Sequence, residues 1–264
     1  MHAAAVGHQC PECVAEGRRT QRQARTAFGG TAAGRRGYVT TTLIALNVLV
    51  AVIGMALSGV GALIGNGVFS GASTVHYFGA VVGPDLLLPD GTVYLGIDNG
   101  GWYRLVTAMF IHYGLLHLLL NMWALWILGR NLEAGLGPTR FLALYLISGI
   151  GGNVAAYLWA PDAALTAGAS GAVFGLMAAF FVLLRRLGRD TSFLMPVLVA
   201  NLVITFAVPQ ISKAGHLGGL VTGALVGVIL AYAAGPRRAL IQAVGCAAVL
   251  AVLLLLTAGR AFVF

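Results

Sequence analysis

Charged residues are scarce in this chain. Asp, Glu, Lys and Arg make up only 9% of its 264 residues, whereas 59% are hydrophobic and the mean hydropathy is +0.88. So little charge excludes an ordinary water-soluble domain. The sequence also lacks the short alternating strands of a membrane barrel and the pattern of an N-terminal signal peptide. These absences leave a helical membrane protein as the predicted class.

Long apolar runs recur along the chain, and they are long enough to cross a hydrocarbon core at 1.5 Å per residue. The 37 glycines suit helices that pack closely in lipid. We therefore expect an all-α, polytopic membrane helix bundle. Its seven helices are predicted near 39–62, 114–134, 139–160, 170–187, 193–211, 215–235 and 239–258.

The basic residues indicate how the bundle is oriented. Residues 1–38 form a polar arm with six arginines, which is predicted to lie in the cytosol. Of the 16 basic residues, only Arg104, Lys213 and Arg260 then fall outside, as the positive-inside rule requires. We expect a multi-pass protein of the cell membrane with a cytoplasmic N-terminus and an external C-terminus. The net charge of +8 is interpreted as topology and not as nucleic-acid binding.

A long segment, 63–113, separates the first two predicted spans on the outer side. It mixes aromatic and aliphatic residues with Gly, Pro and Asp, which favours an amphipathic loop in the membrane interface over a free soluble domain. Trp102 and Tyr103 beside Arg104 are typical of an interfacial anchor.

Polar side chains at membrane depth are costly and usually face the bundle interior. Ser170 begins the fourth span and His216 begins the sixth, and both spans run from outside to inside. The two side chains are therefore expected at similar depth near the outer face. Because a neutral imidazole is the commonest base for a serine hydroxyl, the pair predicts a nucleophile and its base. For Asn153 and Asn201 we expect hydrogen bonds between helices.

A second polar pair, His117 and Asn121, is four residues apart and thus on one helical face. With the backbone N–H of Ser170 at a helix start, these side chains would supply three donors to a developing oxyanion. No carboxylate lies nearby to orient His216, so the arrangement is a dyad.

Glycines recur at four-residue spacing on the same two helices. Gly171 and Gly175 form one small-xxx-small pair, and Gly219 and Gly223 form another on the face of His216. This pattern predicts a close approach of the two helices, which a direct contact between Ser170 and the histidine requires.

Three motifs together resemble those of the rhomboid intramembrane serine proteases. They are "WYRLVTAMFIHYGLLHLLLN", with its H-x4-H-x3-N spacing, "GASG" around Ser170, and "GHLGGLVTG" with its H-x2-G-x3-G spacing. The resemblance covers roughly residues 39–235 and implies a six-helix core. Within the family, the chain resembles bacterial members, and in particular actinobacterial ones. The span at 239–258 is an addition, so the chain divides into the arm 1–38, the core 39–235 and a C-terminal part 236–264.

The resemblance implies a role for each matching residue. Ser170 would be the nucleophile and His216 the general base, while His117 and Asn121 would stabilise the oxyanion. Gly168 would shape the turn before the nucleophile. The external loop, with Trp102 and Arg104 and with His112 beside it, would brace the site. No cofactor is required in this family, and its partners are the lipid bilayer and the transmembrane segments of substrate membrane proteins.

One departure from the family concerns the aromatic ring four residues after the serine. It is often Tyr, stacked on the histidine, and here it is Phe174, for which we expect the stacking without the hydroxyl.

The arm contains "GHQCPEC", in which His8, Cys10 and Cys13 have the spacing of half a zinc site. Structural zinc has four ligands, so the alternative is a pair of reduced cytosolic thiols.

Two other functions stay open on the sequence. A small transporter would use buried His and Asn to line its pathway, but the chain has no evident inverted repeat, and we expect no ionisable carboxylate within its spans. An inactive rhomboid-like binding module would lack the serine or the histidine, and both are present.

Overall fold

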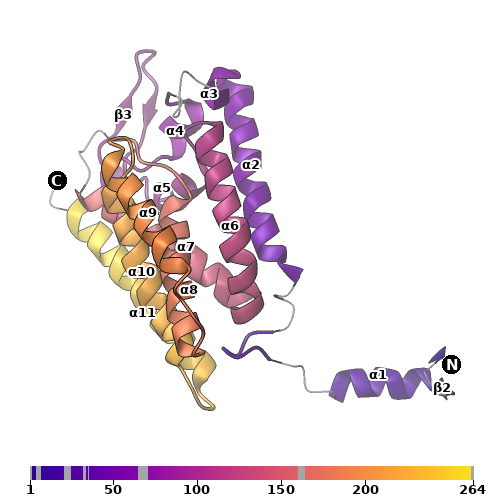
Figure 1. Ribbon diagram of the computed structural model, residues 1–264. Helices are drawn as coiled ribbons and strands as arrows, with labels where there is room; N and C mark the ends of the chain where they lie inside the picture. Colours follow the sequence, from indigo (N-terminus) through magenta and orange to yellow (C-terminus); the bar gives the residue numbers. More distant parts are fainter. Residues whose placement is uncertain are drawn as a thin grey trace.

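The structure is a computed structural model of residues 1–264, drawn in Figure 1. The residues that it describes are 2–3, 7–20, 25–31, 34, 36–64, 71–159 and 164–262. Within these residues, seven long helices form the bundle: α2 (Tyr38–Ser58), α6 (Leu115–Leu136), α7 (Pro138–Trp159), α8 (Ser170–Arg186), α9 (Leu194–Ala207), α10 (Lys213–Tyr232) and α11 (Arg238–Ala261).

These helices confirm the predicted all-α membrane bundle, and their ends lie within four residues of the expected ones. Five of them, α2, α6, α7, α10 and α11, are long and apolar enough to cross a membrane. The other two are shorter, with 17 residues in α8 and 14 in α9. The early end of α9 follows from Pro209, because the residue before a proline disfavours helical backbone.

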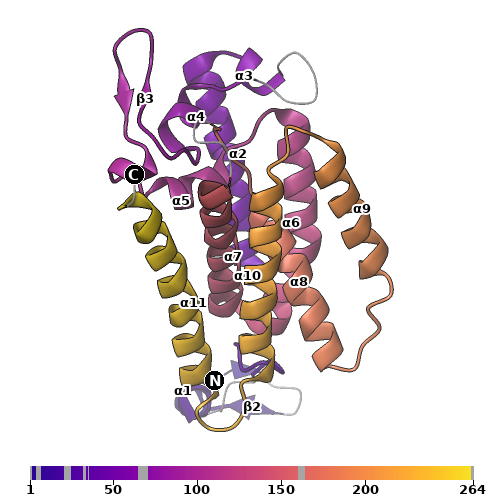
Figure 2. The same cartoon turned by 90° about the vertical axis from the view of Figure 1, so that its left-hand side faces the viewer.

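Helices α7, α8 and α10 form the tightly packed centre of the bundle (Figure 2). Backbone meets backbone there: a Cβ added at Gly223 would overlap the backbone of Gly175, and one added at Gly152 would lie 2.6 Å from the Gly215 carbonyl oxygen. Close approach of this kind between helices depends on glycine. It sets the positions of the side chains at the ends of α8 and α10 that lie nearest Ser170 and His216.

Helices α2 and α6 pack beside this centre, and a carboxylate joins them. Glu133, in the last turns of α6, is fully buried and accepts hydrogen bonds from the N–H groups of Val39 and Thr40, at 3.0 and 2.8 Å, and from the Thr40 hydroxyl at 2.7 Å. It thereby satisfies the first amide groups of α2, which have no acceptor within their own helix. The expectation that no carboxylate lies within the spans was therefore wrong, because this one caps a neighbouring helix.

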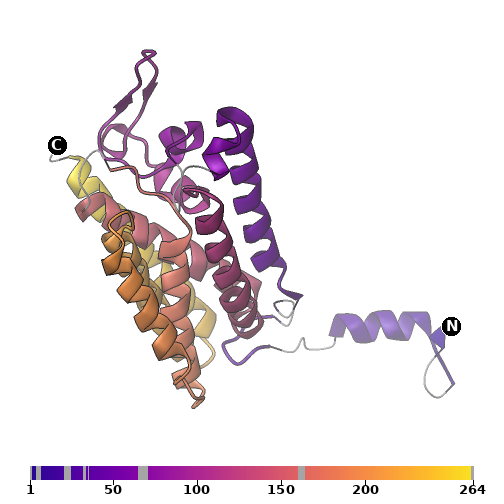
Figure 3. The ribbon, with the colours of Figure 1, turned by 45° about the horizontal axis from the view of Figure 1, so that its top comes forward.

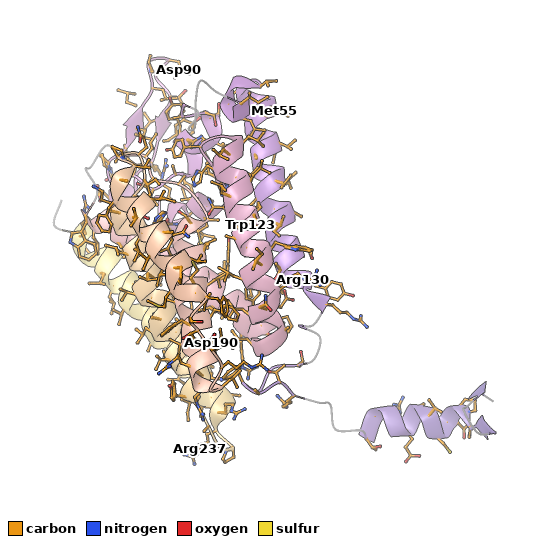
Figure 4. All side chains as sticks on the ribbon, in the orientation of Figure 1. Met55, Asp90, Trp123, Arg130, Asp190 and Arg237 are labelled. Carbon is orange, nitrogen blue, oxygen red and sulfur yellow. The ribbon has the colours of Figure 1, made fainter. Side chains whose placement is uncertain are left out.

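The described part of the predicted external segment, 63–64 and 71–113, forms a cap on one end of the bundle (Figure 1). Its short elements are α3 (Gly61–Ile64), α4 (Thr74–Gly79), β3 (Leu86–Leu87), β4 (Val93–Tyr94), η2 (Ile97–Asn99), α5 (Arg104–Thr107) and η3 (Ala108–Phe110), with β3 and β4 paired antiparallel. Asp90, between these two strands, and Arg237, before α11, lie at opposite ends of the molecule (Figure 4).

The core of the cap is partly polar. Arg104 is fully buried and donates three hydrogen bonds of 2.7 Å each, to the carbonyl oxygens of Leu95, Ala80 and Tyr77. It therefore ties three stretches of the cap together, and the expectation that it belongs to an interfacial anchor was wrong. Five donors in a planar fork suit arginine for holding several carbonyls at once.

The arm is only partly packed on the bundle. Strands β1 (His2–Ala3) and β2 (His8–Gln9) pair antiparallel and precede α1 (Pro11–Thr20), which stands apart from the bundle in Figure 3. By contrast, Phe28 is buried, and its carbonyl accepts a hydrogen bond from Gln242 of α11 at 3.2 Å. A Cβ at Gly30 would overlap the carbonyl of Leu136, so this part of the arm lies directly on the end of α6.

Candidate active site

The site centres on a contact between α8 and α10. Ser170 is the first residue of α8, and His216 lies in the first turn of α10. The His216 Nε2 and the Ser170 Oγ are 2.7 Å apart, which is a hydrogen bond joining residues 46 positions apart in sequence. The structure thus brings together the two residues whose depth the sequence predicted to match.

Glycines on both helices allow this contact. A Cβ at Gly219 would overlap the carbonyl oxygen of Gly171, and one at Gly223 would overlap the backbone of Gly175. The four glycines therefore face one another along the helix pair, starting with Gly171 directly after the serine. Any larger side chain at 219 or 223 would separate the helices and lengthen the Ser170–His216 hydrogen bond.

Two neighbouring side chains hold the imidazole of His216, one stacked on its face and one hydrogen-bonded to its Nδ1. Phe174 stacks on it with ring centroids 4.2 Å apart and an interplanar angle of 24°. The Nδ1 atom lies 2.7 Å from the hydroxyl of Thr205, a fully buried residue of α9. Sequence reasoning did not single out Thr205, because a threonine in an apolar helix is usually satisfied by its own helix carbonyls.

His117 approaches the serine through the turn before it. Gly168 has a φ of 142°, and a Cβ there would lie 2.9 Å from the His117 Cε1, 3.1 Å from its Nε2 and 3.4 Å from the Ser170 Oγ. The His117 Nδ1 accepts a hydrogen bond from the N–H of Tyr113 at 3.3 Å. In a neutral imidazole that leaves the proton on Nε2, which also lies close to the turn, as a donor. Only glycine fits at position 168, because a Cβ there would collide with the His117 ring. Any other residue would also have to adopt this unfavourable backbone φ.

Asn121 lies one turn further along α6 on the same face. Its side-chain amide donates to the carbonyl oxygen of His117 at 2.9 Å. The second amide hydrogen is available for another acceptor, because Asn carries two N–H donors.

Asn201 of α9 does not make the expected hydrogen bond to another helix. Its side-chain amide donates to the Val197 carbonyl of its own helix at 2.8 Å. Asn153, by contrast, does reach another element and donates to the Leu105 carbonyl of α5 at 2.9 Å.

The turn that carries the serine is fastened to the cap. Gly168 N–H donates to the Ala108 carbonyl at 2.9 Å, and the Tyr113 hydroxyl donates to the Leu165 carbonyl at 2.7 Å. His112, itself buried, accepts from the Ala169 N–H through its Nε2 at 3.5 Å and meets His117 edge-on, with centroids 5.0 Å apart. Burial lowers the pKa of His112 well below its ordinary value, so its ring is neutral and able to accept.

The two loop residues predicted to brace the site lie behind it. Arg104 holds the cap from within, as described above, and Trp102 is half-buried against the hydrophobic core. Neither the Arg104 side chain nor the Trp102 side chain makes a hydrogen bond to Ser170. Their contribution is to the shape of the cap.

The candidate metal residues lie far from this site, in the arm. Cys10 and Cys13 are exposed and flank the start of α1, and the side chain of His8 lies outside what the structure describes. Within the described ranges, no group of three or more His, Cys, Asp or Glu side chains is arranged to hold a metal ion. The half-site in "GHQCPEC" therefore gains no further ligand from the described residues.

Comparison with known proteins adds an independent finding. The family model for the Rhomboid domain matches residues 99–233. The chain is 38% identical over 153 residues to "Rhomboid protease GluP" of Bacillus subtilis, covering 53% of this chain and 29% of that protein. It is 39% identical over 137 residues to YdcA of the same organism, covering 50% of this chain and 69% of YdcA. "RHOMBOID-like protein 6, mitochondrial" of Arabidopsis thaliana is 38% identical over 140 residues, which are 44% of its length. The chain thus spans less than a third of GluP and about two thirds of YdcA.

Proposed function

The chain belongs to the rhomboid family, and from this premise we propose that it is an intramembrane serine endopeptidase in which Ser170 and His216 form the catalytic dyad. It hydrolyses peptide bonds in or near the transmembrane segments of other membrane proteins. The observation that carries the proposal is the 2.7 Å hydrogen bond between the His216 Nε2 and the Ser170 Oγ. A serine within hydrogen-bond reach of a neutral imidazole is the arrangement that acyl transfer uses.

The reaction begins with attack of the Ser170 Oγ on the scissile carbonyl, while His216 Nε2 takes the hydroxyl proton. The carbonyl oxygen becomes negatively charged and accepts hydrogen bonds from the Ser170 N–H and from His117 Nε2–H. His216 then returns its proton to the leaving amine, and an acyl-enzyme remains on Ser170. A water molecule, deprotonated by the same histidine, releases the acyl group and restores the serine.

The donor roles follow from local structure. Ser170 opens α8, and the first amide groups of a helix have no acceptor within it, so its N–H is free for an oxyanion and adds the favourable end of the helix dipole. His117 presents its Nε2–H because its Nδ1 already accepts from Tyr113. The two histidines therefore have opposite protonation patterns, which suit opposite roles in the reaction.

The apolar surface of the bundle supports the proposed substrate class. Much of the surface of the bundle is apolar, and Trp123 on α6, labelled in Figure 4, is 66% exposed. Partners of such a surface are lipid and other transmembrane helices. We assign residues 39–235 to the protease core, with residues 1–38 in the cytoplasm of the cell and the dyad opening toward the external side.

A fluorescent fluorophosphonate tests the dyad directly. The detergent-solubilised protein is treated beside Ser170→Ala and His216→Ala variants, at equal concentrations of folded protein. We expect labelling of the wild type alone, because the probe reacts only with an activated serine. Equal labelling of all three proteins would refute the assignment.

Cleavage of a model transmembrane substrate in liposomes decides between a protease and an inactive binding module. The wild type is expected to cleave, and Ser170→Ala is expected to bind without cleaving. A folded Ser170→Ala protein that still cleaves would overturn the mechanism. A wild type that is neither labelled nor cleaves would indicate the binding module.

A further inference from the structure

We propose that Thr205 is a positioning residue for His216, and that through it the alignment of the base depends on how α9 is seated in the bundle. The proposal rests on the proposed function in that it assigns His216 as the base. The hydroxyl of Thr205 lies between two hydrogen-bond partners, the carbonyl oxygen of Asn201 and the Nδ1 of His216, each at 2.7 Å.

The number of protons in this chain of hydrogen bonds fixes the tautomer of the histidine. A threonine hydroxyl has one proton, and the Asn201 carbonyl can only accept, so the hydroxyl donates to Asn201. Toward His216 the same oxygen then acts as acceptor, which requires the ring proton on Nδ1. The Nε2 is left with its lone pair and accepts from Ser170. This is the tautomer that a general base needs, and a hydroxyl here fills the place that a carboxylate holds in a triad.

The opposite tautomer would leave two defects in the site. With the proton on Nε2, the ring would donate toward Ser170 and have no lone pair there to take a proton. Its Nδ1 would then need a donor, and Thr205 has already used its proton on the Asn201 carbonyl. Because both groups are buried, an unmade hydrogen bond there is costly.

Thr205 belongs to α9, which has fewer buried residues than any other of the seven long helices. Of the 14 residues of α9, all of them described, only Leu194 and Thr205 are buried. Val199, Val203 and Phe206 are 52, 61 and 55% exposed, and Figure 2 shows α9 at the outer edge of the bundle. The partner that orients the base is therefore carried by a helix with little hydrophobic contact to hold it. An outward shift of α9 lengthens the Thr205–His216 hydrogen bond before it disturbs the packing of α8 on α10.

Nitrogen NMR of histidine-labelled protein in detergent tests the tautomer without reference to activity. The His216 signals are identified by their loss in His216→Gln. We expect the Nδ1-protonated form in the wild type and in Thr205→Ser, and a mixture of tautomers in Thr205→Val, which keeps the shape but not the hydroxyl. An unchanged tautomer in folded Thr205→Val would overturn the proposal, whether or not the protein proves to be a protease.

Kinetic measurements on the same variants test the consequence. Thr205→Val should lower the fluorophosphonate labelling rate and kcat about tenfold, the effect of one buried hydrogen bond, with KM nearly unchanged. Thr205→Ser should restore both. The control is Thr257→Val in α11, since Thr257 is fully buried and makes the same bond to its own helix, to Leu253 at 3.0 Å, with no histidine involved. Equal losses in Thr205→Val and Thr257→Val would refute a specific role for Thr205.

The dependence on α9 is tested by loosening this helix at its other end. Leu194→Ala removes the second buried side chain of α9, eleven residues from Thr205. We expect it to slow labelling in the wild-type background and to have little further effect in Thr205→Val, so the two losses should not add. Additive losses would show that α9 acts on the site by another route and would overturn the coupling. A wild type that is neither labelled nor cleaves would contradict the proposed function, while the NMR result on Thr205 would stand.

Discussion

Gly219 of α10 rests directly on Gly171 of α8, so that a Cβ at position 219 would overlap the Gly171 carbonyl oxygen and lie 2.6 Å from its carbon. Backbone atoms cannot yield as a flexible side chain can. We therefore predict that Gly219→Ala forces α10 away from α8, lowers the free energy of unfolding by about 1–3 kcal/mol, and strongly reduces labelling of Ser170. Thermal unfolding in detergent and the fluorophosphonate assay measure the two effects.

Gly135 in α6 is the matched control. It is also helical, but a Cβ there meets nothing within 4 Å. Gly135→Ala is expected to raise stability by about 0.5–1 kcal/mol, as alanine does in an unstrained helix, and to leave labelling unchanged. If Gly219→Ala behaved like Gly135→Ala, the close approach of α8 and α10 would not be what positions the dyad.

The proposed oxyanion donors, His117 and Asn121, should contribute unequally. The His117 Nε2 faces the Gly168 turn, whereas the Asn121 amide already donates to the His117 carbonyl. We expect His117→Ala to lower kcat by about 10²–10³ with a small change in KM, as removal of an oxyanion donor does. Asn121→Ala should have a smaller effect. Steady-state cleavage of a transmembrane substrate checks both, and a larger loss in Asn121→Ala would reverse the assignment of the main donor.

How much of this site was predictable depends on the range of each interaction. The spans and the matching depth of Ser170 and His216 follow from hydropathy and topology, which are properties of single segments. The glycine spacing predicted the close approach of α8 and α10 for the same reason. Thr205 was not predictable, because its contact with His216 depends on how α9 is rotated and placed, and no local pattern records that. The burial of Arg104 was missed similarly: an arginine beside aromatic residues is typical of an interface, and only the folded cap supplies its three carbonyl acceptors.

Acid should destabilise the cap through His76. This residue of α4 is 1% exposed, its Nδ1 accepts from the Ser73 N–H at 3.1 Å, and burial lowers its pKa from 6.5 to about 4. Between pH 6.5 and about 4, His76 therefore binds a proton in the unfolded chain but not in the folded one. The free energy of unfolding should fall as the pH drops from about 6.5 to about 4, by roughly 3 kcal/mol for this group, and level off below.

Unfolding midpoints measured across this pH range in wild type and in His76→Gln check the effect. His112, which contacts the same part of the cap and has its pKa lowered by burial, keeps a residual pH dependence in the variant. The slope should be shallower in His76→Gln than in the wild type. Parallel curves would mean that His76 is protonated in the folded protein.

Helix α11 should stabilise the cap through a polar cluster at the end of the helix that contains Arg260. The Tyr157 hydroxyl of α7 donates to the Asp98 carboxylate of η2, and the guanidinium of Arg260 in α11 lies 4.5 Å from the centre of the Tyr157 ring. Three elements from distant parts of the sequence meet there, so α11 fastens the cap to the bundle. Because Asp98 loses a buried donor in Tyr157→Phe, we predict a loss of about 1–3 kcal/mol in the free energy of unfolding.

Arg260→Gln removes the cation over the ring and should cost less, about 1 kcal/mol. Hydrogen exchange of the cap amides distinguishes a local effect from a general one: exchange around η2 should accelerate in both variants, while the amides of α8 and α10 keep their protection. Tyr103→Phe is the control, because the Tyr103 ring stacks on Phe78 within the cap and its side chain is 38% exposed. Unchanged exchange around η2 in Tyr157→Phe would mean that α11 packs on the bundle without bracing the cap.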